Sequence, residues 1–380
     1  MHNFNFYNPT RIISGKDSQK EIGSILKNDK IKSVLLLYGM NSIKKSGLLD
    51  EIKSILEKFE IKFFEHAGVK SNPILTHANE GVSLAKKHNV DAVLAIGGGS
   101  VVDEAKAIVV GAKANCDVWD FYLGKPVAEA LPLYTILTLS ATGSEMNNGS
   151  VLTNEKTIEK FNFASLHTFP KVSIINAELM FSLPMNYLAF SAVDVIAHTV
   201  EVYFTAKNIP LIQKRFMENI IKTVIETTEK IIQNPKDYDA RAEFSLSATW
   251  ALNSLTSMGT GMYAFPNHMI EHSLSAIYDV PHGAGLAVVI PAWMKFTKIE
   301  NEEIYTRFAK EIFGLSTANE GIEAIEKWFR KIEAPTTLQE LKIDKKDNLK
   351  IAQNAFLLSQ KWGMSKKYSV DVIKQILDLA

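Results

Sequence analysis

The sequence predicts two domains of different class, an α/β domain with a parallel sheet followed by an all-helical domain. Three observations support this prediction. The chain has 380 residues, more than one hydrophobic core usually organises. Its first half alternates continuous apolar strands with helical segments, which is typical of a parallel sheet covered on both faces. From residue 186 onward almost every segment has helical periodicity.

The elements follow in order along the chain. Short apolar runs rich in Val, Ile and Leu predict strands, and apolar residues at helical spacing predict helices. We expect strands at 33–38, 61–64, 92–96, 133–139 and 172–175, and helices at 48–59, 76–88 and 101–112. The pattern changes between 181 and 184, so the expected domains are 1–182 and 183–380.

Composition restricts the class of protein. Lys+Arg and Asp+Glu both number 42, so the formal net charge is zero and nothing indicates a nucleic-acid or anionic-membrane partner. Cys116 is the single cysteine, which excludes an intrachain disulfide. The N-terminus lacks a basic segment followed by an apolar run, so no signal peptide is expected. We expect a soluble cytoplasmic protein.

A glycine-rich loop follows the 92–96 strand and opens the next helix. It contains Gly97, Gly98, Gly99 and Ser100. Glycines permit close backbone approach and positive φ, and a helix N-terminus attracts phosphate, so the loop suits a pyrophosphate. Ser100 and Asp103 are three residues apart and suggest a capping box. A tight turn without a ligand remains the alternative, since the sequence is not GxGxxG.

Two further segments at strand ends suggest a coenzyme site. Residues 138–147 follow the 133–139 strand and are rich in small hydroxylated side chains, at an edge where ligands collect in parallel sheets. The segment after Tyr38 contains Gly39 and Ser42, with Lys44 and Lys45 close by and no carboxylate. An acidic residue at this point usually meets the ribose 2′-hydroxyl. Its absence favours NADPH over NADH, although the lysines alone would fit a solvated helix face.

One aspartate and several histidines predict a metal centre. Asp194 and His198 share one helix face at i, i+4 spacing among apolar neighbours, and His268 and His272 repeat this spacing. His282 follows ten residues later. Buried carboxylates and imidazoles need partners, and a plain Asp–His hydrogen bond is one solution. The accumulation of ligand types favours a shared divalent ion, Zn²⁺ or Fe²⁺.

Long motifs in the chain resemble one known family. They are FYNPTRIISGK (6–16), the SNP turn (71–73), GGGSVVDEAK (97–106), LSATGSEMN (139–147), SAVDVIAHTVE (191–201) and HMIEHSLSAIYDVPHGAGLA (268–287). In their order and spacing they resemble the iron-containing (group III, metal-dependent) alcohol dehydrogenases, within them the NADPH-dependent butanol dehydrogenase and aldehyde reductase branch. The resemblance implies a dehydroquinate synthase-like fold: a dinucleotide-binding (Rossmann-like) α/β domain, then an all-α metal-binding domain, with the active site in the cleft between them.

The resemblance also implies roles for individual residues. The family's metal ligands correspond to Asp194, His198, His268 and His282, and His272 matches a histidine close to the metal and the nicotinamide, which could relay a proton. Coenzyme-lining positions correspond to Gly39, Ser42, Asn72, Gly97, Gly98, Gly99, Ser100, Asp103, Thr138, Thr142, Asn147 and Lys160.

The implied activity is NADPH-linked reduction of short-chain aliphatic aldehydes to primary alcohols of the butanol type, by a homodimer. The metal would polarise the carbonyl oxygen while the nicotinamide delivers hydride. Alternatives are an NADH-linked polyol or glycerol-type dehydrogenase, a dehydroquinate synthase-like lyase, and a nucleotide-binding scaffold with a structural metal. A lyase of that type needs basic residues around its substrate. Met262, Phe265, Met269 and Ile270 instead suggest an apolar pocket, and a structural metal site would usually be richer in cysteine.

Overall fold

The computed structural model describes residues 1–380, which divide into two compact units. The sheet unit comprises Tyr7–Leu183 and Lys236–Thr249. The helical unit comprises Met1–Phe6, Pro184–Pro235 and Trp250–Ala380. The predicted class, an α/β domain with a parallel sheet and a helical domain, is confirmed.

The sheet unit contains eight strands and six α-helices before residue 183. Its strands are β1 (Arg11–Ser14), β2 (Ser33–Tyr38), β3 (Lys62–Ala67), β4 (Ala92–Gly97), β5 (Leu133–Leu137), β6 (Gly149–Asn154), β7 (Glu159–Ala164) and β8 (Val172–Ile175). Its helices are α1 (Ile22–Asn28), α2 (Ser42–Lys45), α3 (Leu48–Lys58), α4 (Leu75–His88), α5 (Gly99–Lys113) and α6 (Trp119–Tyr122), with short 3-10 turns at Ser18–Glu21, Ser144–Met146, Leu166–Thr168 and Ala177–Met180.

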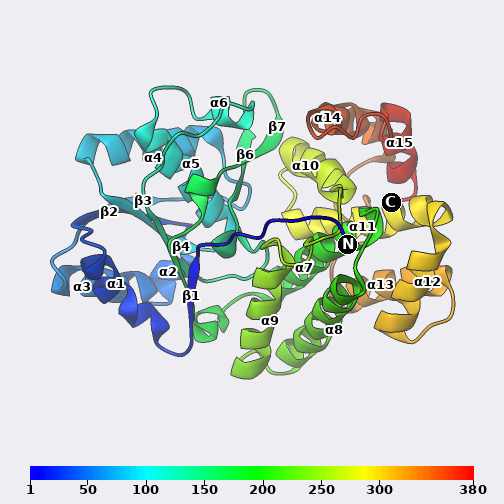
Figure 1. The fold of residues 1–380 in the computed structure, drawn as a ribbon, viewed down its shortest axis with the longest axis horizontal. Coiled ribbons are helices and arrows are strands. Elements are labelled where there is room, and N and C mark those ends of the chain that lie inside the picture. The colour runs from blue at the N-terminus through cyan, green and yellow to red at the C-terminus, as the bar shows by residue number, and fades with distance from the viewer. The chain divides into compact units, whose positions relative to one another are not determined.

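Six parallel strands form one sheet in the order β1-β8-β5-β4-β2-β3. Helices cover both faces of this sheet (Figure 1). Val34 and Leu36 of β2 pack with α1 and α3 on one face, and Leu35 and Leu37, which point the opposite way, are equally buried. Burial on both faces explains why the strands read as continuous apolar runs.

Three strands were missed by the sequence prediction. β1 is a four-residue edge strand that pairs only with β8. β6 and β7 form an antiparallel hairpin outside the main sheet, with residues of mixed burial. Short or half-exposed strands lack the apolar run that marks the central ones, so their pairing is decided by the tertiary context.

The helical unit is organised around one long, apolar helix. Its elements are α7 (Met185–Thr205), α8 (Leu211–Gln233), α10 (Pro266–Tyr278), α11 (His282–Thr297), α12 (Glu302–Phe313), α13 (Ala318–Lys331), α14 (Asn348–Lys361) and α15 (Val370–Asp378), with 3-10 turns at Lys298–Glu300 and Lys345–Asp347. α7 alone is long and apolar enough to cross a membrane, but 83% of its apolar window is buried inside the protein. It is therefore a core helix.

The two units are not consecutive in sequence. The helix α9 (Tyr238–Ala251) lies in the part of the chain that the sequence groups with the helical half, yet residues Lys236–Thr249 belong to the sheet unit. There Thr249 donates to Glu145 (2.6 Å) and Ser245 lies 3.5 Å from the sulfur of Met180. The chain thus returns to the sheet unit after α8.

Candidate active site

The coenzyme residues expected from the sequence gather at one edge of the main sheet. β2, β4 and β5 are neighbouring parallel strands, so their carboxyl ends at Tyr38, Gly97 and Leu137 lie side by side. The segments that follow these strands carry Gly39, Gly98 and Thr138. The sheet topology therefore brings three separate sequence segments to the edge where nucleotides bind in folds of this class.

The glycine loop opens α5 without a side-chain cap. Gly98 is the N-cap, and no side chain accepts a hydrogen bond from the first turn. This arrangement leaves the helix N-terminus suited to an anion. The expectation of positive φ is wrong, because Gly97, Gly98 and Gly99 all lie outside that region. The glycines are needed for close packing instead: a Cβ on Gly99 would lie 2.2 Å from Oγ1 of Thr142.

The capping box expected from Ser100 and Asp103 does not form. Ser100 donates its hydroxyl to the carbonyl of Ser71 at 2.5 Å, which ties the glycine loop to the turn that contains Asn72. Asp103 accepts from the hydroxyl of Ser144 (2.5 Å) and the amide of Val151 (3.2 Å). Its carboxylate therefore holds the 138–147 loop and the start of the hairpin rather than the helix terminus.

A buried lysine that the sequence analysis overlooked completes this network. Lys106 is fully buried on α5 and donates to Ser144 (2.8 Å), Asn147 (3.0 Å) and the carbonyl of Gly149 (2.7 Å). Asn147 in turn lies 3.4 Å from the carbonyl of Thr142. Burial lowers the pKa of Lys106 to about 8 against the pull of Asp103 and Glu145. The sequence signal was a lysine directly before the apolar run of residues 107–110 on this helix.

Lys160 and Asn72 also meet, although they are 88 residues apart in sequence. The ammonium of Lys160 donates to Oδ1 of Asn72 at 3.0 Å, and both side chains are buried. Lys160 comes from β7 of the hairpin and Asn72 from the turn before α4. Two residues expected to line the coenzyme are thus in direct contact.

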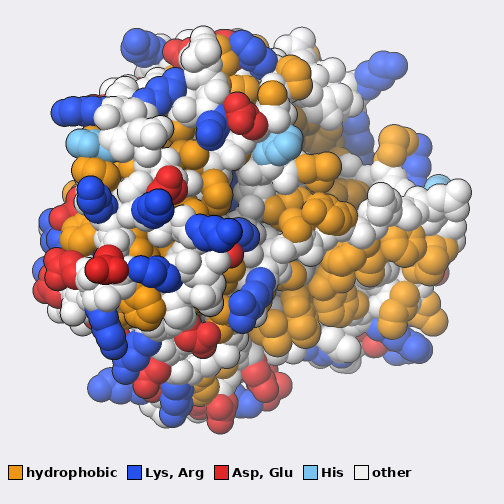
Figure 2. Space-filling model, turned by 60° about the vertical axis from the view of Figure 1, so that its left-hand side comes forward, with side chains coloured by type: hydrophobic (Ala, Val, Ile, Leu, Met, Phe, Trp, Pro, Cys, Tyr) orange, Lys and Arg blue, Asp and Glu red, His pale blue; other side chains and the backbone are white.

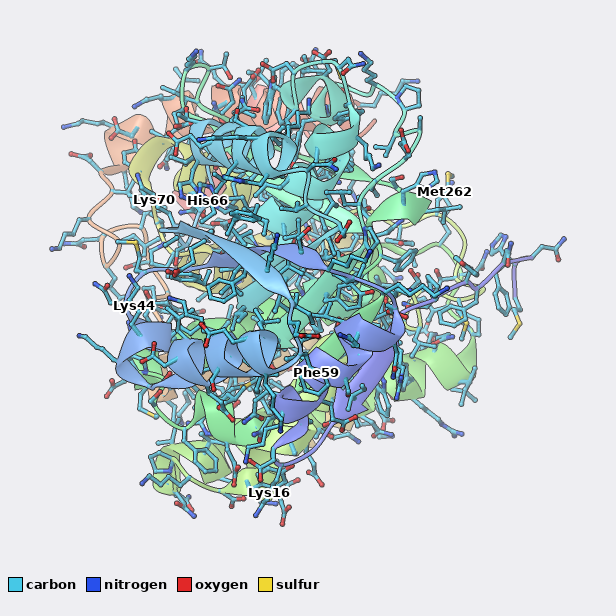
Figure 3. The ribbon with its side chains drawn as sticks, turned by 90° about the vertical axis from the view of Figure 1, so that its left-hand side faces the viewer. Lys16, Lys44, Phe59, His66, Lys70 and Met262 are labelled. Atoms are coloured by element: carbon cyan, nitrogen blue, oxygen red, sulfur yellow. The ribbon has the colours of Figure 1, made fainter.

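The end of β2 carries no carboxylate of its own. Met40, Asn41 and Ser42 are exposed, and Figure 3 shows Lys44 near this end of the sheet unit. The nearest acidic partner is Glu65 on β3, which accepts from Tyr38 (2.6 Å) and pairs with Lys53 (2.7 Å). These two donors help to lower the pKa of Glu65 although its burial opposes them. Its negative charge is therefore already paired.

The four expected metal ligands converge within the helical unit. Oδ1 of Asp194 lies 3.6 Å from Nε2 of His198, 3.7 Å from Nε2 of His268 and 3.5 Å from Nε2 of His282. The ligand atoms of Asp194, His268 and His282 all lie within 4.8 Å of one another. The ring of His198 stacks on His268 with centroids 4.7 Å apart. Helices α7, α10 and α11 supply these residues.

The polar atoms that face this point lack protein partners. Oδ1 of Asp194 and Nε2 of His268 are buried and have no hydrogen-bond partner. A buried polar atom without a hydrogen-bond partner lowers the stability of the fold unless an ion or a water molecule binds it. One carboxylate and three imidazoles are a donor set that suits Zn²⁺ or Fe²⁺. The residues present therefore fit a divalent cation, and the 23% exposure of the His282 side chain leaves one side of the group open.

Burial and the neighbouring charges act in opposite directions on the pKa values of this group. Burial alone would raise the pKa of Asp194, but the three imidazoles hold it well below its ordinary range. Burial lowers the pKa of His198 to about 3, which leaves a neutral imidazole with a free lone pair. Burial also disfavours charged His268, yet Glu201 and Asp194 raise its pKa to about 10. A bound cation would take the place of that proton.

Two buried glutamates stand behind the histidines. Glu201 lies 2.5 Å from Nδ1 of His268, and Glu271 accepts at Nδ1 of His282. Such carboxylate–histidine pairs orient metal-binding imidazoles. Neither glutamate was among the site residues predicted from the sequence. The available signal was their position, each three residues after an expected ligand on the same helix.

His272 lies close to the metal-ligand group. Its ring centroid is 5.8 Å from that of His282, 6.4 Å from that of His268 and 5.6 Å from that of Trp362. Trp362 was not anticipated, since it directly follows α14 and lies outside the motifs, the last of which ends at Ala287.

The expected apolar pocket is only partly present. Phe265 packs edge-on against His268 with centroids 5.4 Å apart. Met269 and Ile270 are fully buried core residues of α10, and Met262 is 72% exposed and projects outward (Figure 3). The expectation failed for Met269 and Ile270 because α10 turns these side chains into the core, and for Met262 because it precedes α10 and is exposed.

Comparisons with known proteins match the whole of this architecture. The profile of the iron-containing alcohol dehydrogenases matches residues 9–177, and that of the C-terminal domain of the same family matches residues 188–380. The chain is 38% identical to a probable NADH-dependent butanol dehydrogenase of Bacillus subtilis over 387 aligned positions, with 99% of each chain covered. It is 33% identical to the NADPH-dependent aldehyde reductase YqhD of Escherichia coli, with 90% of each chain covered.

A solved structure is also similar to this chain over its whole length. The crystal structure of NADH-dependent butanol dehydrogenase A from Thermotoga maritima superimposes with a TM-score of 0.97 at 44% identity, covering 100% of this chain and 99% of that one. Both profiles, the curated relatives and this structure agree in fold and in coverage. The chain therefore belongs to the iron-containing alcohol dehydrogenases, a family of oxidoreductases.

Proposed function

We propose that the protein is a metal-dependent, NADPH-preferring alcohol dehydrogenase that interconverts short-chain aliphatic aldehydes and primary alcohols of the butanol type. The observation that carries the proposal is the convergence of Asp194, His198, His268 and His282 on one point, with unpartnered ligand atoms. The names of the relatives, which include butanol dehydrogenases and an aldehyde reductase, support this substrate class.

The residues of the chain have distinct tasks in this reaction. Bound NADPH would supply the hydride, and a divalent cation, Fe²⁺ or Zn²⁺, would supply Lewis acidity at the carbonyl oxygen. Asp194 and the three imidazoles would hold that cation. The amides at the start of α5, with Gly97, Gly98, Gly99 and Ser100, would bind the pyrophosphate, and Thr138, Thr142, Asn147 and Lys160 would line the coenzyme around them.

His272 is the proposed proton donor to the product oxygen. Imidazole titrates near neutral pH and serves as a general acid or base when it lies next to the reacting group. His272 is buried and its ring lies beside His282 and Trp362. Replacement by Phe would keep the packing against Trp362 and remove the proton relay.

The coenzyme preference rests on the end of β2. Gly39, Ser42 and the lysines of α2 leave room for a 2′-phosphate, and the closest carboxylate, Glu65, is paired with Lys53. Four relatives and the Thermotoga maritima structure are named as NADH-dependent, whereas one relative is named as NADPH-dependent and one as NADP-dependent, so the names do not support an NADPH preference. The preference therefore rests on this chain's own residues.

One set of assays tests the proposal. The protein is purified anaerobically, its metal content is measured, and activity is restored with Fe²⁺, Zn²⁺, Ni²⁺ or Co²⁺. Butyraldehyde should drive oxidation of NADPH, with a higher kcat/KM than for NADH. His268→Ala should lose metal and turnover while its NADPH dissociation constant stays near that of the wild type. Full activity of that variant would disprove the metal assignment.

We further propose a cytoplasmic homodimer. Figure 2 shows hydrophobic side chains gathered over a broad area of the surface. Exposed apolar residues of the helical unit include Met1, Phe4, Leu211, Ile212, Met262 and Tyr263. Large exposed apolar patches mark protein–protein interfaces. Light scattering of the purified protein gives the mass that tests the dimer.

A further inference from the structure

The two glutamates behind the metal-ligand histidines are both enclosed, yet their surroundings differ. Glu201 on α7 and Glu271 on α10 have no exposed surface. Each carboxylate uses one oxygen for Nδ1 of a histidine, which leaves Nε2 of that ring directed at Asp194. Each carboxylate thus acts on the metal-ligand group through an imidazole.

Glu201 faces backbone amides, which can donate a hydrogen bond but cannot accept one. Its Oε2 lies 2.5 Å from Nδ1 of His268, and its Oε1 accepts from the backbone amides of Asn267 and His268, the latter at 3.2 Å. A backbone N–H can only donate. An ionised carboxylate can only accept, so Nδ1 of His268 must carry a hydrogen, and in the neutral ring, the form that binds a cation, Nε2 then presents its lone pair.

Glu271 faces the hydroxyl of Ser275, which can either donate or accept a hydrogen bond. Its Oε2 accepts from Nδ1 of His282, and its Oε1 accepts from the hydroxyl of Ser275. A hydroxyl both donates and accepts. The Ser275 hydroxyl also lies 3.1 Å from the carbonyl of Val280, to which it can donate instead. A group that donates to Ser275 would therefore be tolerated at the Oε1 position.

We infer that Glu201 and Glu271 are unequal positioning residues: Glu201 fixes the metal-binding tautomer of His268 because its Oε1 faces backbone amides that can only donate, whereas Oε1 of Glu271 faces the hydroxyl of Ser275, which can also accept. The inference rests on the proposed metal function. It predicts different outcomes for the same isosteric change. In Glu201→Gln the side-chain NH2 group must face either the backbone amides, which also donate, or Nδ1 of His268. In the second arrangement Nδ1 has to accept, so the hydrogen of the ring moves to Nε2, the atom that would bind the metal. In Glu271→Gln the amide can donate to Ser275 while its oxygen still accepts from His282.

The test measures metal affinity rather than turnover. Co²⁺ is titrated into the metal-free protein against a competing chelator, and the visible absorption of bound Co²⁺ reports the coordination. We expect Glu201→Gln to bind Co²⁺ about 10–100-fold more weakly and to show altered Co²⁺ bands at saturation. Glu271→Gln should keep the affinity and the spectrum of the wild type.

Glu218 offers a matched control in the same unit. It is buried, and its two oxygens accept from Tyr203 (2.7 Å) and from Arg307 (2.7 and 2.9 Å). Glu218→Gln therefore also places an amide against a fixed donor, but it touches no metal ligand. It should leave the Co²⁺ affinity unchanged even if it lowers the melting temperature.

The outcomes separate the inference from the function on which it rests. Equal losses in Glu201→Gln and Glu271→Gln, wild-type affinity in Glu201→Gln, or an equal loss in Glu218→Gln would each overturn the inference. Asp194→Asn tests the site itself. If wild type and Asp194→Asn bind Co²⁺ alike, the metal centre is wrong; if only Asp194→Asn loses affinity, the centre stands and the role of Glu201 falls.

Discussion

Single residues in the sheet unit show how burial changes ordinary side-chain chemistry. Lys106 makes three hydrogen bonds in the interior, and its ammonium compensates the carboxylates of Asp103 and Glu145. Desolvation opposes this charge, so the residue titrates more easily than a surface lysine. The free energy of unfolding of the sheet unit should therefore depend on pH near pH 8, where a surface lysine stays protonated.

The first prediction concerns this lysine in the coenzyme-free protein. Its pKa falls from 10.5 to about 8 on folding, so between these values the unfolded chain binds more protons than the folded one. The free energy of unfolding should therefore rise with pH in this window, by on the order of 1 kcal/mol per unit. Urea unfolding of wild type and Lys106→Gln between pH 7 and 10 measures the difference. Parallel curves would contradict the prediction, and Lys87→Gln on the surface serves as the control.

A second prediction concerns Gly99. An added Cβ would lie 2.2 Å from Oγ1 and 2.4 Å from Cγ2 of Thr142, so Gly99→Ala forces the two loops apart. We expect a loss of about 1–3 kcal/mol in the free energy of unfolding and weaker NADPH binding in calorimetry. Thr142→Ala in the same chain should restore part of both, and strictly additive effects would argue against the contact.

At the scale of elements, the metal-ligand group depends on a close crossing of helices. Asp194 and His198 share one face of α7, and α11 brings His282 to them. Gly283 permits the crossing, because a Cβ there would lie 2.1 Å from the carbonyl oxygen of Phe190 on α7. The contacting atoms of Phe190 belong to the backbone, which cannot move aside by changing a rotamer. This contact therefore sets the spacing of α7 and α11.

The third prediction follows from this crossing. Gly283→Ala should separate α7 from α11, with a loss of at least about 1–3 kcal/mol in unfolding free energy and weaker retention of metal through dialysis. Gly149→Ala is the control, since its Cβ would make only an ordinary contact at 3.6 Å. A Gly283→Ala protein with wild-type melting temperature and metal content would show that the crossing is adaptable.

At the scale of the whole molecule, the chain enters the sheet unit twice. Lys236–Thr249 returns to it from the helical half, and Thr249 satisfies the buried carboxylate of Glu145. Burial raises the pKa of Glu145, and the hydrogen bond from Thr249 limits that rise. The first 183 residues therefore lack part of their own core.

The fourth prediction tests this division. A fragment of residues 7–183 should unfold less cooperatively than the same fragment joined by a flexible linker to residues 236–249, because the latter covers Met180 and Glu145. Thermal unfolding followed by circular dichroism compares them. If both fragments melted alike, α9 would be dispensable for the unit.

The amino-acid sequence alone determined the periodicities and the ligand types. Apolar runs marked the four inner strands β2, β4, β5 and β8 because those strands are buried on both faces. The i, i+4 spacing placed Asp194 with His198 on one helix face, since a helix repeats every 3.6 residues. Only the tertiary structure decided contacts between distant segments: Lys160 with Asn72, Glu201 with His268, α9 with the sheet unit, and the hairpin β6–β7. Local pattern records which face of an element is apolar, whereas such contacts depend on how whole elements pack, which no single segment encodes.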